Sequence, residues 1–402
     1  MILAAASIEY PGYIPTAWQT FLLTVLLLSL HAGISSMPTR WIARVNSYGS
    51  TFNMLALITV LIAIPAGVTS NPNNNNKTGF TPSSEVWRTI TNGTDFPDGI
   101  AVLMTFVGVI WTMAGYDSPF HLSEECSNAN IAAPRAITIT SAAGGVLGWL
   151  LQLVVAYTVQ DIEAVMDSPL GQPWASYLLQ VLPQRTAIAL LALTIVCGFS
   201  MGQGCMVAAS RVTYAYARDD CFPLSRVWKR VNLRTHTPVN AVLLNAALGI
   251  CMSLLMLAGP VAIGALFSIG AIAQFVAFAI PIAIRVVCHG RFRRGPWHLG
   301  RWGRVVGGVG VVFVVFMVPV LCLPQTTGRR LSAKLMNWTC LVYGAPMLGV
   351  VVWWVVDARW WFKGPRVNVE HVVVVVDEED GDGDVDGRGS QDSTRSLTER
   401  FK

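Results

Sequence analysis

Nine long apolar stretches, separated by polar segments, dominate the pattern of residues along the chain. They lie at residues 17–35, 50–68, 99–120, 136–160, 186–210, 238–258, 261–284, 305–323 and 338–356. Eight of the nine contain no Asp, Glu, Lys or Arg, and the third contains Asp117 alone. A helix needs about 20 mostly apolar residues to cross a bilayer, and the apolar residues here are continuous rather than alternating. The pattern therefore predicts an all-α membrane protein with nine transmembrane helices.

Composition agrees with this prediction. Of the 402 residues, 53% are apolar and only 13% are charged, which is about half of the roughly 25% typical of soluble domains. So few charges cannot cover the surfaces of two or three soluble domains. The composition excludes a soluble enzyme, a nucleic-acid binder and a disordered chain, and it makes the lipid bilayer the main partner.

The distribution of Lys and Arg predicts the orientation in the membrane. With the C-terminus in the cytoplasm, the inner loops and the segment after the last span carry eighteen basic residues, and the outer loops carry six. Cytoplasmic loops are enriched in Lys and Arg. We therefore expect a cytoplasmic C-terminus.

Two glycosylation sequons agree with this orientation. Asn76-Lys-Thr and Asn92-Gly-Thr both lie in the loop 69–98, which the orientation places outside. Asn337-Trp-Thr also lies on the outer side, but at the edge of a span, where a chance match is the better interpretation.

The two ends of the chain differ in character. The first fifteen residues contain no positive charge and only a short apolar run, so they fit neither a signal peptide nor a full span. Because nine spans with a cytoplasmic C-terminus put the N-terminus outside, we expect an odd number of helices upstream. Residues 367–402 carry ten acidic and four basic residues. They predict a disordered acidic cytoplasmic tail, so that residues 1–366 form the transmembrane domain.

Asp117 is the first candidate for a functional residue, because a charge inside the bilayer is costly and usually marks a pathway or a buried partner. Gly115 and Pro119 flank it, and both residue types weaken a helix. One interpretation is a broken helix that lines a binding site, as in many transporters. The other is a kinked packing helix whose Asp117 bonds to backbone, and periodicity favours neither.

Other polar groups give weaker signals. Glu124, Glu125 and Arg135 predict an ion pair in an inner loop, either solvated or acting as a latch. The small residues of 197–205 predict close helix packing, with a wall of the binding site as the alternative. The eight cysteines show no CxxC and no metal-ligand spacing. Since no catalytic motif is present, an enzyme is not expected, and neither a metal nor a cofactor is implied.

Four segments together resemble a known family. They are GYDSPFHLSEECSNANIAAPRAI at 115–137, the stretch ASRVTYAYARDDCFPLSRVWKRVNLRTHTPVNAV at 209–242, GPWHLGRWG at 295–303 and YPGYIPTAW at 10–18. They are similar to segments of fungal amino-acid permeases of the APC superfamily, and most similar to the branch of GABA, choline and polyamine permeases. The resemblance covers residues 9 to about 366 and aligns the nine predicted spans with helices four to twelve of that family.

The resemblance implies a fold of two inverted repeats of five helices followed by two further helices. It also implies proton-coupled import of an amino acid or related amine across the plasma membrane, with the proton gradient in place of a cofactor. Substrate contacts of the family's sixth helix would fall on six residues of this chain: Trp111, Thr112, Ala114, Gly115, Tyr116 and Asp117. Trp111 would be an aromatic gate able to hold a cationic amine.

The chain departs from the family pattern in two respects. Helices one to three have no counterpart, including the glycine-rich break of the first helix that receives a substrate carboxylate. The Lys that some relatives carry in the fifth helix is absent from 50–68. Three hypotheses therefore stay open: a working transporter, a non-transporting permease fragment and, with least support, a membrane enzyme or receptor.

Overall fold

A computed structural model describes residues 1–10, 12–70, 79–126, 128–221, 223–257, 260–288, 295–328, 331–332, 336–362 and 364. All regular elements in these ranges are helices, and no strand occurs there. Asn76 and the acidic tail 367–402 lie outside the described residues, so the structure tests neither of these predictions.

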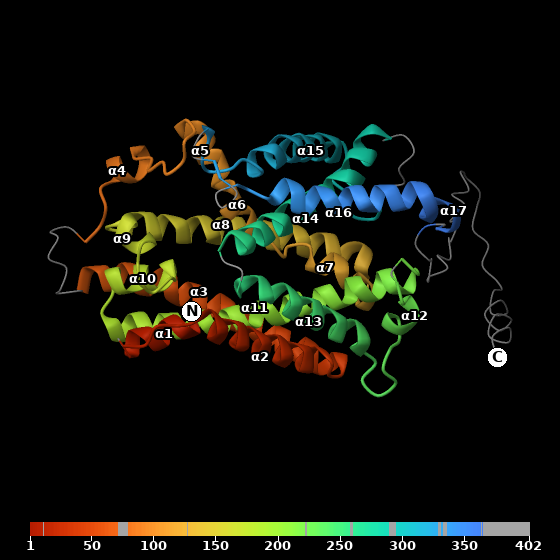
Figure 1. Ribbon diagram of the computed structural model, residues 1–402, viewed down its shortest axis with the longest axis horizontal. Helices are drawn as coiled ribbons and strands as arrows, with labels where there is room; N and C mark the ends of the chain where they lie inside the picture. Colours follow the sequence, from red (N-terminus) through yellow and green to blue (C-terminus); the bar gives the residue numbers. More distant parts are fainter. Residues whose placement is uncertain are drawn as a thin grey trace, which may run out of the picture. The chain divides into compact units, whose positions relative to one another are not determined.

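Seven helical segments are long and apolar enough to cross a membrane. They are α2 (Ala17–Ser35), α3 (Thr39–Ser70), α8 (Ala129–Thr158), α11 (Gln184–Arg218), α13 (Val239–Ser253) with the short 3-10 helix η2 (Leu254–Leu257), α15 (Trp302–Leu321) and α16 (Thr339–Trp353), which a π-helix η5 (Trp354–Ala358) continues. An eighth predicted span, 261–284, corresponds to α14 (Pro260–Val287). These helices confirm the predicted all-α membrane fold and run side by side in Figure 1.

The remaining predicted span, 99–120, is not one helix. It is divided into α5 (Asp98–Met104), α6 (Phe106–Met113) and α7 (Ser118–His121). Some other boundaries also differ from expectation. The helix α3 begins at Thr39 rather than near residue 50. Its first turns are polar, so the apolar pattern that predicted the span did not include them.

Short helices gather at the two ends of the bundle. One end, called here the α10 end, carries four of them: α1 (Ile2–Glu9), α4 (Ser83–Arg88), α9 (Ile162–Met166) and α10 (Pro173–Val181). The opposite α12 end carries α7, the 3-10 helix η1 (Ser123–Glu125), α12 (Ser225–Trp228) and α17 (Arg359–Trp361), and Figure 1 shows this separation. The bundle therefore has two distinct ends, and the long helices run between them.

Apolar contacts hold the helices together in three groups. At the α10 end, Ile64 of α3, Leu178 of α10 and Leu191 of α11 are almost fully buried. A second group joins α2, α11 and α13, and a third joins α6, α14 and α15 around buried residues Ile110, Ile272 and Met317. The third group packs α6, which is part of the divided span 99–120, against α14. The same helix α14 carries Gln274, a polar residue of the site described next.

Candidate functional site

The span 99–120 is interrupted at three consecutive residues, Met113, Ala114 and Gly115. The helix α6 ends at Met113, and Ala114 adopts an extended conformation with φ −63° and ψ 149°. Gly115 follows with φ +94°, a conformation that residues with a Cβ rarely adopt. The chain then turns into α7, where Pro119 lies in the first turn, a position that needs no N–H donor. Of the two interpretations given above for Asp117, the structure shows the broken helix.

Asp117 lies directly after this break and is held by two side chains. His121 Nε2 lies 2.8 Å from Asp117 Oδ2, and Gln274 of α14 donates from Nε2 to Asp117 Oδ1 at 2.7 Å. The Asp117 side chain is 12% exposed and that of His121 is 22% exposed. A carboxylate with two side-chain partners and little solvent is fixed in position and can accept a further donor from a ligand.

A cavity of about 400 Å³ opens beside Asp117. Its lining residues come from the break and from three other helices: Ala114, Gly115, Asp117, Ser118, His121, Cys205, Ala208, Ala209, Val212, Thr213, Asn245 and Gln274. Among the described lining residues, Asp117 is the one carboxylate, and none is Lys or Arg. The volume lies within the range of about 300–1,000 Å³ common for small-molecule sites.

Helix α11 makes room for the cavity, and α13 supplies an amide. Ala208 and Ala209 are small, so α11 leaves space opposite the break. Asn245 of α13 donates from Nδ2 to Thr213 Oγ1 at 2.9 Å and to Ala241 O at 2.8 Å. The cavity therefore has a fixed polar rim on apolar walls, the usual construction of a specific small-molecule pocket.

The six residues expected from the family resemblance divide into two groups. Ala114, Gly115 and Asp117 line the cavity. The other three contact neighbouring helices: an added Cβ on Gly270 would lie 3.1 Å from the Trp111 ring, and one on Gly148 would lie 3.5 Å from the Thr112 methyl group. The Tyr116 ring lies 6.3 Å from that of Phe278. In this conformation Trp111 packs on α14 and does not cover the cavity.

Sequence reasoning missed His121, Gln274 and Asn245 as residues of the site. His121 is four residues after Asp117, a spacing that brings two side chains together on one face of a helix. Gln274 and Asn245 are amides in otherwise apolar spans, which was an available signal. The expected ion pair of Glu124, Glu125 and Arg135 is different for Glu125, whose Oε1 accepts from Nε of Arg211 at 2.8 Å, while Arg135 is exposed. The side chain of Glu124 lies outside the described residues.

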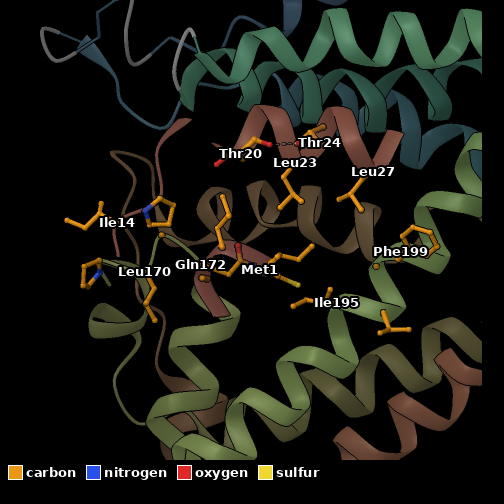
Figure 2. A pocket seen from close by; sticks show the side chains of 18 of the residues that line it. Met1, Ile14, Thr20, Leu23, Thr24, Leu27, Leu170, Gln172, Ile195 and Phe199 are labelled. Carbon is orange, nitrogen blue, oxygen red and sulfur yellow. Dashed lines mark hydrogen bonds between the residues drawn. The ribbon is translucent and has the colours of Figure 1, made fainter. Parts of the chain in front are cut away.

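A second hollow, of about 810 Å³, lies between α1, α2 and α11 (Figure 2). The side chains of Leu23 and Leu27 point into it from α2, and Ile195 faces it from α11. Its lining is mostly apolar, and His31 is the one ionisable side chain among the described lining residues. The His31 ring is already bonded through Nε2 to Phe199 O at 3.1 Å. This hollow lacks a carboxylate for an ammonium group, so the smaller cavity is the better candidate site.

The long apolar helices and the interrupted span define a multi-pass helical membrane protein, and the cavity at the helix break is its candidate small-molecule site. Comparison with known proteins identifies the family. A family model described as "Amino acid permease" matches residues 1–346, so the chain belongs to the amino acid permease family of the APC superfamily and has that family's helical transporter fold.

Several fungal proteins are similar over most of their length. An uncharacterized amino-acid permease of Schizosaccharomyces pombe is 51% identical over 372 residues, which are 92% of this chain and 68% of the relative. A putative polyamine transporter of Candida albicans is 42% identical over 406 residues, covering 100% of this chain and 73% of the relative. Amino-acid permease 2 of Neurospora crassa is 30% identical, covering 92% and 66%.

These comparisons bear on two expectations. The relatives are named permeases and transporters, which agrees with the prediction of a non-enzymatic protein. The chain spans about two thirds of the length of the first relatives it matches, with shares of 68%, 65% and 64%.

Proposed function

We propose that this chain carries the substrate site of a secondary transporter that imports small amines, and that Asp117 binds the substrate's ammonium group. The observation that carries the proposal is the enclosed Asp117 carboxylate beside a cavity of about 400 Å³. Where water is excluded, attraction between an ammonium and a carboxylate is stronger than in bulk water. The amino-acid permease family and the putative polyamine transporter among the relatives support the same class of substrate.

The lining also favours some amines over others. It offers one carboxylate and no Lys or Arg, so a substrate carboxylate would meet no permanently positive side chain. The hydroxyl of Ser118 already donates to Gly115 O at 2.8 Å, and both amide hydrogens of Asn245 are bonded within the protein. Among the candidate classes, polyamines and choline therefore fit this cavity better than zwitterions such as GABA or other amino acids.

We further propose that import is proton-coupled and that Asp117 and His121 carry the proton between them. Their 2.8 Å contact lets one proton occupy either side chain, and the amide of Gln274 fixes the other Asp117 oxygen. Cys205 and Tyr116 are the further titratable groups next to this pair. The proposed location is the plasma membrane, with the α12 end and the C-terminus in the cytoplasm and with glycosylation of Asn76 and Asn92 on the outer side.

Uptake assays test this proposal. The tagged chain is expressed in yeast lacking its own permeases, and uptake of labelled polyamine, choline, GABA and amino acids is measured with and without a proton gradient. We expect saturable, gradient-dependent uptake that falls at least about tenfold in D117N, equivalent to losing about 1.4 kcal/mol of attraction. E163Q on α9 is the matched control, because it removes the same charge at an exposed position far from the cavity.

Two outcomes would contradict the proposal. If D117N and E163Q reach the cell surface in equal amounts and show equal uptake, Asp117 has a packing role and does not bind the substrate. No uptake despite normal surface expression would favour the non-transporting fragment.

A further inference from the structure

Two cysteines meet where α15 ends and α16 begins. Cys322 directly follows Leu321, the last residue of α15, and Cys340 is the second residue of α16. The Cys322 and Cys340 side chains lie close enough to interact electrostatically, because the segment around Cys322 is bonded to Asn337, three residues before Cys340. Cys340 is exposed and Cys322 is half-buried. The two thiols are thus neighbours, although seventeen residues separate them along the chain.

Asn337 holds the two segments in this position. Its Nδ2 donates to Leu321 O at 3.0 Å and to Leu323 O at 3.1 Å, which are the carbonyls on either side of Cys322. Its Oδ1 accepts from the backbone N–H and the hydroxyl of Thr339, which precedes Cys340. One side chain therefore fixes the backbone next to both cysteines, independently of the contact between the thiols.

This role also bears on the third sequon. Both amide hydrogens of Asn337 are used by the carbonyls beside Cys322, and Thr339 is fully buried. The Asn337 sequon therefore differs from that of Asn92, because its Thr339 is fully buried whereas Thr94 is partly exposed.

The pair lies at the α10 end of the bundle. The segment after Cys322 contacts the loop before α5: Thr327 donates its N–H to Asp95 Oδ2 at 2.9 Å, and Asp95 donates its N–H to Gln325 O at 3.1 Å. In Figure 1 the described residues that directly follow α15 pass close to α5. In the orientation proposed above, this end faces the lumen of the secretory pathway and later the cell exterior, where disulfides form and persist.

We propose that Cys322 and Cys340 form an intramolecular disulfide in the mature protein. The oxidant is a protein disulfide of the secretory pathway. The thiolate of one cysteine attacks that disulfide, and the second cysteine resolves the mixed disulfide. One S–S bond forms between Cys322 and Cys340 and one breaks in the oxidant. The oxidant receives the two electrons and, with them, the two protons that the cysteines lose.

The disulfide would tie the outer ends of α15 and α16 together. Because Gln325 and Thr327 bind Asp95, it would also restrict the segment that enters the broken span through α5. The inference rests on the proposed orientation and does not depend on which substrate is carried.

Counting thiols in the full chain tests the inference. Cells are quenched in acid, free thiols are blocked under denaturing conditions, and the protein is then reduced and treated with a maleimide-polymer that adds visible mass to each newly exposed thiol. We expect two of the eight cysteines to react only after reduction, and a peptide that links residues 322 and 340 in mass spectrometry. C322S, C340S and the double variant should each lose both additions, and C251S should keep them.

A second measurement follows the effect on stability. A reducing agent should lower the melting temperature of the purified wild-type chain and leave that of C322S/C340S unchanged. Eight free thiols in protein isolated from the cell surface, or a linked peptide that does not contain both residues, would overturn the inference. A tag accessibility assay in the same cells reports the orientation separately, and uptake reports the proposed function separately.

Discussion

At the scale of single residues, α11 and α2 approach each other closely where Gly202 faces His31. A Cβ placed on Gly202 would lie 2.7 Å from Cε1 of His31. His31 is 7% exposed, and its ring is bonded to Phe199 O and lies 4.5 Å from the Phe199 ring. The imidazole therefore cannot move away easily, and only glycine fits at position 202.

We expect G202A to destabilise the protein by about 1–3 kcal/mol, the usual cost of overpacking a fixed contact. The matched control is G204A, two residues further along α11, where an added Cβ meets nothing within 4 Å. Thermal unfolding of the purified variants in detergent provides the measurement. Equal melting temperatures for the two variants would show that His31 moves freely.

The same crossing answers a question that the sequence left open. The small residues of 197–205 were compatible with helix packing or with a site-facing wall. Gly202 contacts His31, and Gln203 donates from Nε2 to Ser35 Oγ at 2.8 Å, so both residues face α2. Cys205 instead borders the cavity. The two alternatives therefore apply to different faces of one helix.

At the scale of elements, one ion pair joins the end of the broken span to α11. Arg211 of α11 is 6% exposed, and its partner Glu125 of η1 is 39% exposed. Arg211 Nη1 also donates to Ser210 Oγ at 3.3 Å. Because α7 and η1 follow the break directly, this pair holds the segment after Asp117 against α11 at the α12 end.

We expect E125Q to cost about 1–2 kcal/mol, between the small value of exposed ion pairs and the larger value of buried ones. R211Q should cost more, because it also loses the contact with Ser210. A double-mutant cycle with E125Q/R211Q, measured by thermal unfolding, should give a favourable coupling energy. Strictly additive effects would mean that Glu125 and Arg211 act separately.

The break itself shows how far an element could be foreseen. Gly115 and Pro119 beside Asp117 indicated a weakened helix, and the structure places the turn at Ala114 and Gly115. No residue pattern indicated that the same apolar stretch also divides at Thr105, between α5 and α6. At that position the chain continues in helical conformation, with φ −68° and ψ −14°, so no turn residue marks it.

At the scale of the whole molecule, the threefold excess of basic residues in the predicted inner loops makes the orientation testable. A tag at the C-terminus should react with antibody only after cells are permeabilised, whereas a tag inserted into the loop 71–78 should react in intact cells. The reverse pattern would contradict the predicted orientation and the lumenal position of Cys322 and Cys340.

The sequence by itself determined the membrane class and the helical fold, it indicated the family through the resemblance of its segments, and it marked Asp117 as a candidate. These follow from local properties, because apolar length, charge distribution and helix-weakening residues can be read one segment at a time. The tertiary structure decided which groups meet: Gln274 of α14 and His121 at Asp117, and Arg211 rather than Arg135 at Glu125. It also brought Cys322 to Cys340. Such contacts depend on how separate helices pack against each other, and spacing within one segment does not specify that packing.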